Sequence, residues 1–412
     1  MTQDKALKIM LSGSNIFLTG SPGSGKTYLL NEYISRARKR GLKVAVTATT
    51  GIAATHLDGI TIHSWAGIGL SEHLTDKDKL KIFKNQKLVN RYKFTDVLVI
   101  DEVSMLSGSR LDLVNELSRM IRKSNEVMGG IQLILVGDLF QLPPVNARPD
   151  QYVFNSQTWQ SANLKICYLS EQHRQQLGDE LNSILQIIRA NKISEVELAV
   201  LSSKLNSSSN ISSNVLRLYS HNFDADELNE KNINRLKSRE KVYRMRTKGS
   251  KNEVTKLKNS ILSPETLKLK VGCQVIFTAN NYKEGYVNGD RGRVVDLKGG
   301  LPIVRMNRAA YLKVKPHHYR AEVGEDTLAE AWQLPLKLAW AITIHKSQGM
   351  SLDEAEIDLA RAFSPGMGYV ALSRLKTIDG LHLLGLNKMA LYVDHNVAKI
   401  DRILRAESDK LM

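Results

Sequence analysis

The stretch Gly20-Ser21-Pro22-Gly23-Ser24-Gly25-Lys26-Thr27 decides how this chain folds. It fits the pattern G-x-x-x-x-G-K-[ST], in which glycines let backbone N–H groups surround phosphate oxygens where a helix begins. Lys26 would neutralise the β- and γ-phosphates of a nucleoside triphosphate, and the Thr27 hydroxyl would coordinate Mg²⁺. The sequence therefore predicts an ATP site that uses Mg²⁺. The predicted nucleotide contacts in this loop are Gly23, Ser24, Gly25, Lys26, Thr27 and Tyr28.

An apolar run that ends in two acids supplies the second half of such a site. Leu98-Val99-Ile100 has the pattern of a buried strand, and Asp101 and Glu102 follow it directly. Carboxylates at the C-terminal edge of a parallel sheet lie close to the metal and the nucleotide. We assign Asp101 to the metal and Glu102 to orienting and deprotonating the attacking water. Adjacent acids after a strand are also common as plain loop residues, and the phosphate loop favours the catalytic interpretation.

Short apolar runs alternate with helical patterns on both sides of this loop. Such alternation is typical of a parallel sheet with helices on both faces. A polar, helix-prone insertion from about Leu70 to Lys93 interrupts the pattern. The expected elements are strands at Asn15–Thr19, Lys43–Ala48, Val97–Ile100 and Gln132–Gly137, and helices at Lys26–Arg40 and after Leu106.

The alternation resumes after a loop rich in Ser and Asn, at Ser202–Asn214. We therefore predict an α/β chain with two parallel-sheet units. The expected elements of the second unit are strands at Val215–Tyr219 and Gln274–Thr278, a helix near Asp224–Leu236, and further α/β structure from Leu336 onward.

Residues 286–316 have a different character from the units around them. The turn signal Asn288-Gly289-Asp290 precedes three short strand-like pieces at Arg293–Leu297, Pro302–Met306 and Ala310–Val314. This pattern indicates a small insertion that resembles a β-barrel.

The charge of the chain indicates an anionic partner. Its 412 residues include 58 Lys and Arg against 42 Asp and Glu, a formal net charge of +16. Nucleic acid is the most common partner of so basic a protein. Much of the excess is local, because Lys231–Lys258 contains eleven basic and two acidic residues. That window is interpreted either as part of a nucleic-acid surface or as a solvated basic loop.

Other features of the composition exclude several classes of protein. A hydrophobic fraction of 42% and a charged fraction of 24% are typical of globular chains, and no apolar run is long enough to span a membrane. Cys167 and Cys273 form neither a disulfide framework nor a zinc site, which favours a reducing cytoplasm. The N-terminus has no apolar core of a secretory signal and is a poor transit peptide.

Further motifs extend the match beyond the nucleotide site. They are Asp101–Met105 (DEVSM), Gly129–Ile134 (GGIQLI), Gly137–Val145 (GDLFQLPPV), Ala339–Gly349 (AWAITIHKSQG) and Tyr369–Arg374 (YVALSR). In this order they resemble the Pif-one (petite integration frequency) family, the RecD-like DNA helicases of superfamily one, class B. The resemblance covers nearly the whole chain. It implies two RecA-like domains, ATP-driven 5′-to-3′ unwinding, and work in DNA repair, recombination and telomere maintenance.

The resemblance also implies roles at the ATP site for residues outside the phosphate loop. Gln141 matches the residue that senses the γ-phosphate and couples it to DNA, and Gln3 matches the adenine-contacting glutamine. An amide can pair bidentately with adenine, although Gln3 alone would be a frayed terminal residue. Arg174 and Arg374 resemble two arginine fingers, which would stabilise transition-state charge from the second domain. Gln348 and Gly349 are further expected nucleotide contacts.

The same resemblance implies a groove for single-stranded DNA. Hydroxyls and small residues after a strand suit hydrogen bonds to phosphate, and Phe140 would offer a ring for base stacking. A Phe after a strand is also a common core residue, and the two histidines lack metal-ligand spacing. The expected DNA contacts are Thr47, Thr49, Thr50, His63, Phe140, Pro143, Thr343, His345 and Lys346.

These inferences combine into one expected organisation. We predict a monomeric ATP-dependent DNA helicase whose partners are single-stranded DNA and duplex or fork DNA, with G-quadruplex as a further candidate and no membrane. Two alternatives remain: a DNA-stimulated ATPase that regulates or loads without unwinding, and a small-molecule P-loop kinase. The expected domains are 1–67 with 96–168 (first RecA-like domain), 68–95 (insertion, candidate wedge), 169–280 with 332–412 (second RecA-like domain) and 281–331 (SH3-like insertion).

Overall fold

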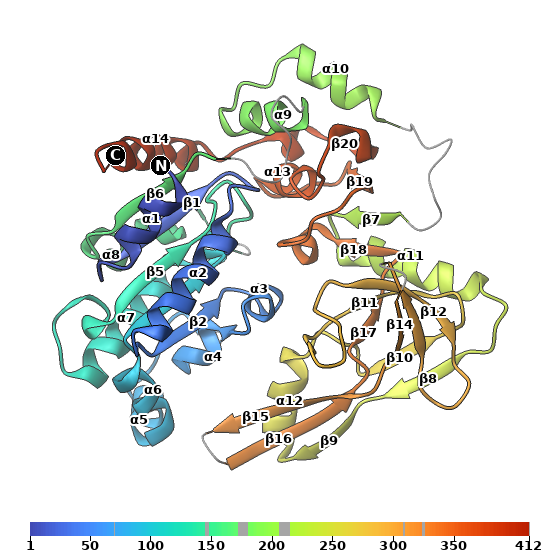
Figure 1. Ribbon diagram of the computed structural model, residues 1–412, viewed down its shortest axis with the longest axis horizontal. Helices are drawn as coiled ribbons and strands as arrows, with labels where there is room; N and C mark the ends of the chain where they lie inside the picture. Colours follow the sequence, from blue (N-terminus) through green and yellow to red (C-terminus); the bar gives the residue numbers. More distant parts are fainter. Residues whose placement is uncertain are drawn as a thin grey trace.

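Two parallel sheets lie side by side, and antiparallel sheets lie next to the second of them (Figure 1). This arrangement confirms the predicted α/β class. None of the helices in the described part of the chain is both long and apolar enough to cross a bilayer. The computed structural model describes residues 1–69, 71–144, 148–171, 180–205, 215–307, 310–323 and 326–411.

The first sheet has six parallel strands in the order β3-β2-β4-β5-β1-β6. The strands are β1 (Ile16–Gly20), β2 (Val44–Ala48), β3 (Ile60–Thr61), β4 (Val97–Asp101), β5 (Gln132–Val136) and β6 (Lys165–Leu169). The helices of this half are α1 (Gln3–Met10), α2 (Lys26–Lys39), α3 (Gly51–His56), α4 (Ile62–Ala66), α5 (Asp76–Lys84), α6 (Gln86–Phe94), α7 (Gly108–Arg122) and α8 (Gln157–Ser161).

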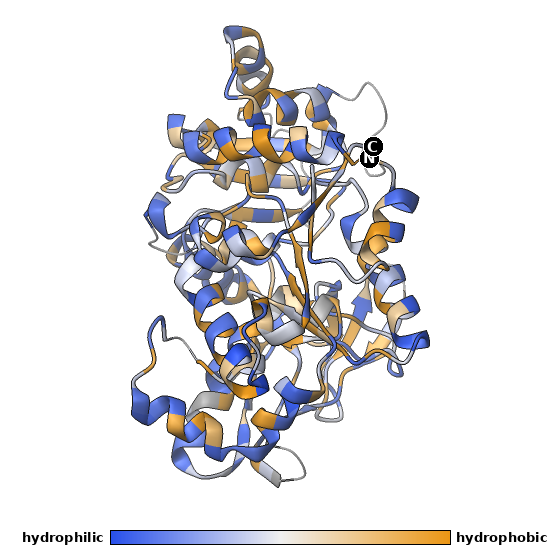
Figure 2. Ribbon diagram, turned by 90° about the vertical axis from the view of Figure 1, so that its left-hand side faces the viewer, coloured by the Kyte–Doolittle hydropathy of each residue, from blue (hydrophilic) through white to orange (hydrophobic). Residues whose placement is uncertain are grey.

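Alternate residues of each central strand enter two separate cores. In β4, Leu98 and Ile100 pack on one face of the sheet with α7, whereas Val97 and Val99 pack on the other with α1 and α2. A strand that is buried on both faces has to be apolar throughout, which explains its continuous apolar run. Figure 2 shows such apolar strands (orange) between helices that carry hydrophilic residues (blue). The expected strands of this half are therefore confirmed, and the insertion after residue 70 contains the helices α5 and α6.

The second sheet has four parallel strands in the order β18-β7-β19-β20. Its strands are β7 (Leu216–Tyr219), β18 (Ala341–Thr343), β19 (Ala355–Leu359) and β20 (Leu381–Leu386). Its helices are α9 (Glu180–Arg189), α10 (Glu195–Ser203), α11 (Asn222–Arg235), α13 (Met367–Leu372) and α14 (His395–Asp409). Helix α14 packs against β6 of the first sheet, so the C-terminal helix joins the two halves.

The antiparallel part is larger than the expected insertion at residues 286–316. The segment Gln274–Thr278 was expected in the second parallel sheet, but this was wrong: it forms β11 (Gln274–Phe277), which pairs antiparallel with β12 and β17. The strands β8 (Lys241–Arg244), β9 (Arg246–Gly249), β10 (Thr266–Leu269), β12 (Arg291–Asp296), β13 (Ile303–Met306), β14 (Tyr311–Lys313), β15 (His317–Val323), β16 (Asp326–Gln333) and β17 (Leu336–Leu338), with helix α12 (Lys251–Ser260), complete this part.

A glycine at the start of α13 brings the two parallel-sheet units into close contact. Gly366 has a φ of +79°, and a Cβ there would lie 2.6 Å from the Phe140 carbonyl oxygen and 3.0 Å from that of Gln141. The loop after β5 therefore lies against the backbone of α13. Only a residue without a side chain permits this approach.

We predict that Gly366→Ala destabilises the protein more than Gly13→Ala does. Gly13 has nearly the same φ, +85°, but no atom lies within 4 Å of its added Cβ. The control therefore shows the cost of the left-handed backbone alone, about 1–2 kcal/mol. Urea unfolding of both variants measures the difference. Equal losses in the free energy of unfolding would show that the loop after β5 moves to make room for the added Cβ at no cost in stability.

Candidate functional site

The phosphate loop lies between β1 and α2, where its sequence predicted it. Gly20, Gly23 and Gly25 have φ values of +147°, +85° and +82°, which L side chains rarely adopt. A Cβ on Gly20 would also lie 2.8 Å from the Leu169 carbonyl oxygen and from Ser24 Oγ. The glycines thus give the loop the tight turn that directs backbone N–H groups toward a phosphate at the start of α2.

Lys26 lies within this loop and is held by it. Its Nζ donates to the carbonyl oxygens of Gly20 and Ser21 at 2.8 and 3.0 Å. Burial lowers the pKa of Lys26, and the nearby carboxylates of Asp138, Glu102 and Asp101 oppose that shift. A desolvated ammonium surrounded by backbone carbonyls is a ready partner for phosphate oxygens. Thr27 and Tyr28, at the start of α2, are both exposed.

The two acids after β4 are half-buried close to Lys26. Burial and the neighbouring Glu102 carboxylate raise the pKa of Asp101 to about 7, and burial raises the pKa of Glu102 against the opposing charge of Arg374. Glu102 has a left-handed backbone with φ of +51°, and Thr49 Oγ1 donates to its carbonyl oxygen at 2.9 Å. Glu102 Oε2 is buried and has no hydrogen-bond partner among the described residues. Strained backbone and an unpartnered carboxylate oxygen are typical of functional sites.

The donor set at this edge of the sheet fits Mg²⁺. This ion prefers oxygen ligands and is usually bound by one or two protein groups together with nucleotide phosphates. The hydroxyl of Thr27 and the carboxylate of Asp101 are such groups. The described residues contain no cluster of three or more His, Cys, Asp or Glu side chains that could hold a metal without a nucleotide.

Gln3 lies beside the phosphate loop and is anchored there. Its Nε2 donates to the Ser24 carbonyl oxygen at 3.4 Å, and it is the first residue of α1. The amino group of Met1 donates to the Tyr168 carbonyl oxygen at 2.6 Å. The start of the chain is therefore ordered against the nucleotide loop, and Gln3 is not a frayed terminal residue.

Arg374 of the second unit and Gln141 of the first are two further residues that were predicted at the nucleotide site. Arg374 lies just after α13 and is buried, and its Nε donates to the Val370 carbonyl oxygen at 3.0 Å. Its charge acts on Glu102 of the first unit, so the structure brings these two predicted residues together. Gln141 is buried, and its Oε1 has no partner among the described residues.

The remaining predicted nucleotide contacts have different outcomes. Gln348 is buried, with an Nε2 that has no partner in the described part of the chain, and Gly349 beside it is exposed with φ of +79°. Arg174 lies outside the described residues, so its role stays a prediction.

Sequence reasoning missed a buried arginine that joins the two units. Arg189, at the end of α9, is 4% exposed and contacts Asp138, the acid of the GDLFQ motif, at 2.8 Å. The Tyr369 hydroxyl of α13 donates to the same Asp138 oxygen at 2.8 Å and accepts from Arg189 at 2.7 Å. Arg189 also donates to Tyr168 of β6, whose hydroxyl donates to Asp401 of α14 at 2.9 Å. Asp138 and Tyr369 lie in motifs that the sequence identified, but no motif points to Arg189.

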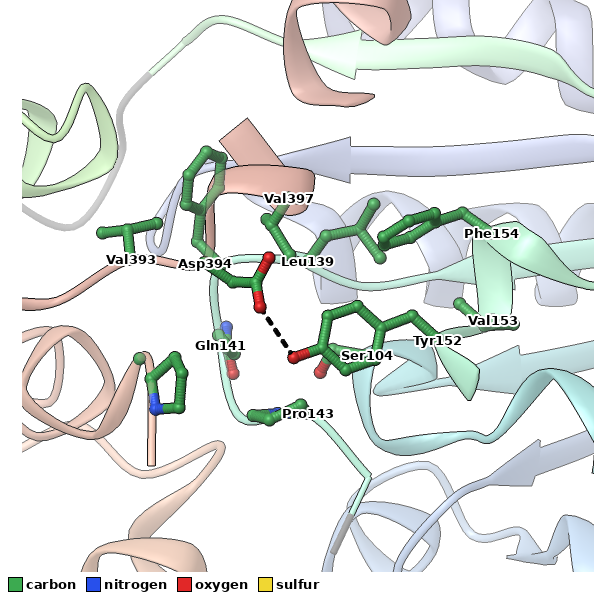
Figure 3. Close-up of a pocket in the computed structure, with 13 residues that line it drawn as sticks. Ser104, Leu139, Gln141, Pro143, Tyr152, Val153, Phe154, Val393, Asp394 and Val397 are labelled. Carbon is green, nitrogen blue, oxygen red and sulfur yellow. Dashed lines mark hydrogen bonds between the residues drawn. The ribbon is translucent and has the colours of Figure 1, made fainter. Parts of the chain in front are cut away.

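A second buried contact between the units borders Gln141. Tyr152 donates to an Asp394 carboxylate oxygen at 3.0 Å, beside a cavity of about 20 Å³ (Figure 3). Gln141, Ser104 and Pro143 line the same cavity, and Ser104 Oγ has no partner among the described residues. The volume is enough for one water molecule that would bridge these polar atoms.

The predicted DNA contacts of the first unit divide into surface and buried residues. Thr47 is fully buried and donates to the Val99 carbonyl oxygen at 2.6 Å, and Phe140 is 3% exposed beneath Arg189, whose Cζ lies 4.3 Å from the ring centroid. Both side chains therefore stabilise the protein core in this structure, which does not support their expected DNA contacts. Thr50 is partly exposed at the start of α3, and Thr49 holds Glu102. Burial lowers the pKa of His63 to about 4.

In the second unit, an exposed aromatic ring accompanies the predicted contacts. Phe363 is 54% exposed, and its ring centroid lies 4.9 Å from that of His221 and 6.3 Å from that of His345. Lys346 donates to Asn222 at 2.8 Å, and burial lowers its pKa to about 8. Thr343, by contrast, is buried. Sequence reasoning missed Phe363, because a Phe in a loop has no pattern that separates a surface ring from a core ring.

The fold and the site define an ATP-driven motor with two RecA-like units. The family model of PIF1-like helicases matches residues 3–197. The chain is 40% identical to the ATP-dependent DNA helicase Pif1 of Psychrobacter sp., over 96% of this chain and 69% of that protein. The chain belongs to the PIF1-like helicase family.

Solved structures of this family have the same fold. The Pif1 helicase of Candida albicans is 32% identical with a TM-score of 0.86, over 98% of both chains. Pif1 helicase from Bacteroides in complex with ADP-AlF3 and ssDNA is 29% identical with a TM-score of 0.73, over 99% of this chain and 97% of that one.

We predict that Arg189→Met lowers the free energy of unfolding by about 3–5 kcal/mol, because it leaves Asp138 buried without its ion-pair partner. Arg36→Met is the matched control, since Arg36 forms an exposed pair with Glu32 worth about 0.3–0.5 kcal/mol. Urea denaturation measures both variants. A double variant with Asp138→Asn should recover part of the loss. A loss in Arg189→Met no larger than in the control would contradict the buried pair as a stabilising joint.

We predict that Arg374→Ala reduces the DNA-stimulated kcat for ATP by a factor on the order of 10³–10⁵, with a much smaller change in nucleotide affinity. A guanidinium that meets the γ-phosphate across the cleft contributes more in the transition state than in the ground state. Arg374→Lys should rescue poorly, because an ammonium lacks the planar fork. The measurements are kcat and the Kd of a non-hydrolysable ATP analogue. Near wild-type hydrolysis by Arg374→Ala would refute a shared active site.

Proposed function

We propose that this chain is an ATP-dependent DNA helicase that moves along single-stranded DNA and separates duplex DNA. One observation carries the proposal: the charge of Arg374, in the second unit, opposes the rise in the pKa of Glu102, which lies close to Lys26 and Asp101 in the first unit. This supports a single nucleotide site with residues from both units. Binding and hydrolysis of ATP at such a site alter the distance between the units. Two relatives of the chain are named ATP-dependent DNA helicase Pif1, which supports the same activity. The 5′-to-3′ direction is inferred from the family resemblance.

In the proposed reaction, the residues of this chain have separate tasks. Lys26 neutralises the phosphates, and Arg374 adds charge as the γ-phosphoryl group leaves. Glu102 Oε2 takes the proton of the attacking water, a task that suits a carboxylate whose pKa is raised by burial. Gln141 orients that water or the γ-phosphate through its unpartnered amide oxygen. Mg²⁺, bound by Thr27 and Asp101, would neutralise charge that develops on the phosphates.

The DNA would lie across the ends of both sheets. Thr49, Thr50 and His63 belong to the first unit, and His345 and Lys346 to the second. The exposed ring of Phe363 is our candidate for base stacking in place of Phe140. The Bacteroides Pif1 complex with ADP-AlF3 and ssDNA supports binding of a nucleotide and a single strand to the same molecule in this fold. The segment 68–95 stays a candidate for the wedge.

The second candidate function is a DNA-stimulated ATPase that regulates or loads without unwinding. It shares the nucleotide site and the groove, so ATPase assays alone do not distinguish it. Duplexes with a 5′ or a 3′ single-stranded tail do. We expect ATP-dependent strand separation from the 5′-tailed duplex only. DNA-stimulated hydrolysis with no separation of either substrate would favour the second candidate, and hydrolysis without DNA stimulation would favour a small-molecule kinase.

We predict that Lys26→Ala abolishes ATP hydrolysis and unwinding but retains binding to single-stranded DNA without nucleotide. The reason is that Lys26 donates its hydrogen bonds to the phosphate loop, whereas the proposed groove uses other residues. Fluorescence anisotropy with a labelled single strand measures binding, and phosphate release measures hydrolysis. Loss of DNA binding along with hydrolysis, in a variant that unfolds like wild type, would contradict the separation of the two sites.

A further inference from the structure

The three-stranded sheet formed by β15, β16 and β9 has two faces of different character. One face packs on α12, where Ala329 and Ala331 of β16 contact Leu257, and Tyr319 of β15 packs against the same cluster. The neighbours of these residues in the strands have side chains on the other face, because successive side chains alternate. That second face is called the open face below. Figure 1 shows β15, β16 and β9 at the lower edge of the molecule, far from α13.

Antiparallel register places the open-face residues in two rows across the three strands. His318 pairs with Trp332, and Trp332 pairs with Arg246, which makes the first row. Residues that pair directly in this way lie on the same face of a sheet. The second row runs from Arg320 through Glu330 to Lys248.

Contacts within the rows hold the aromatic groups in fixed positions. The His318 ring stacks on Trp332 with centroids 4.6 Å apart and an interplanar angle of 11°. Glu330 Oε1 lies 2.8 Å from His318 Nε2, and Glu330 Oε2 lies 3.8 Å from Lys248 Nζ. Glu330 thus orients two groups of the face, and Trp332 stays partly exposed beside them.

The basic character of the open face continues along the chain. Arg244, two residues before Arg246, is exposed at the end of β8, and Lys268 is exposed on the adjacent strand β10. Met245, between the two arginines, points to the α12 side. The basic window Lys231–Lys258 therefore places some of its cations on one face, next to a tryptophan, rather than scattering them around a loop.

We propose that the open face binds a second single strand of DNA, outside the cleft between the parallel sheets. The proposal rests on the helicase function proposed above, because unwinding produces a displaced strand in addition to the one that the motor tracks. Arg244, Arg246 and Lys248 contact phosphates, and Trp332 stacks a base. Cations along a backbone path with an aromatic ring beside them are the usual elements of sequence-independent single-strand binding.

A single strand fits the face better than a duplex does. Cations alone would suffice for the phosphates of a duplex, whose bases are stacked on one another and offer no face to a side chain. Trp332 stands among charged residues with His318 as its ring neighbour, and an aromatic ring in that setting matches an unstacked base. Duplex binding is therefore the alternative outcome of the test.

The test compares two DNA forks that share a 5′ loading tail and differ in the other arm, which is single-stranded in one and absent in the other. The variants are Trp332→Ala and the double variant Arg246→Glu with Lys248→Glu. The measured quantity is the ratio of the unwinding rate on the two-armed fork to the rate on the one-armed fork. We expect each variant to lower this ratio about tenfold, which corresponds to the loss of one stacked base or of two phosphate contacts. Hydrolysis stimulated by single strands and unwinding of the one-armed substrate should change less than twofold.

Two controls accompany these variants. The double variant Lys298→Ala with Lys313→Ala removes two exposed cations, one in the loop after β12 and one in β14 of the five-stranded antiparallel sheet, and should change the unwinding of neither substrate. Trp332→Phe should retain much of the effect of the second arm, because it keeps an aromatic ring. Circular dichroism melts of all variants report whether the hairpin remains folded.

Each other outcome overturns the proposal. An equal loss of unwinding rate on both forks would indicate that the open face belongs to the groove for the single strand along which the motor moves. Unchanged unwinding by Trp332→Ala together with loss in the charge-reversal variant would indicate duplex or non-specific phosphate binding. No change in either variant would leave the face without a DNA role. Failure of the wild-type protein to unwind the one-armed substrate would instead refute the helicase function itself.

Discussion

The pairing of Asp138 with Arg189 is the interaction on which the arrangement of the two units depends. Both side chains are almost completely removed from water, so separating them would leave a buried charge without a partner. Asp138 follows β5 of the first sheet, whereas Arg189 ends a helix of the second unit. Tyr369 completes the joint from α13. The orientation of one RecA-like unit against the other is thus determined by a charge pair as well as by apolar packing.

This joint lies next to the chemistry. The Asp138 carboxylate is the charge that most strongly opposes the lowering of the Lys26 pKa, and Arg189 acts in the opposite sense. Phe140 and Gln141 lie two and three residues after Asp138, with their carbonyl oxygens against Gly366 at the start of α13. A shift of one unit relative to the other therefore changes both the field at Lys26 and the position of Gln141, the residue proposed to sense the γ-phosphate. These contacts between the units support the proposed coupling between nucleotide binding and domain movement.

The parts that the sequence predicted are those determined by contiguous residues. Neighbouring residues determine glycine turns and apolar runs. A local pattern is therefore enough to predict the phosphate loop, the acids after β4 and the strands of the first sheet. The family resemblance added Gln3, which the contact with Ser24 makes plausible, and Arg374, which lies close enough to affect Glu102. Four of the predicted DNA contacts, Thr47, Thr49, Phe140 and Thr343, are buried, because the motif gives the residue type but not the direction of its side chain.

The parts that the sequence did not predict depend on pairing between distant segments. Strand β11 resembles a buried parallel strand, and only its neighbours β12 and β17 make it antiparallel. Arg189 looks like the last residue of an amphipathic helix until Asp138, fifty-one positions earlier, is brought against it. The open face follows the same rule: Trp332, His318 and Arg246 are separated in the chain by strands and a helix, and antiparallel register alone brings them into one row. The face on which the side chains of a basic window lie is therefore known only when the pairing of its strands is known.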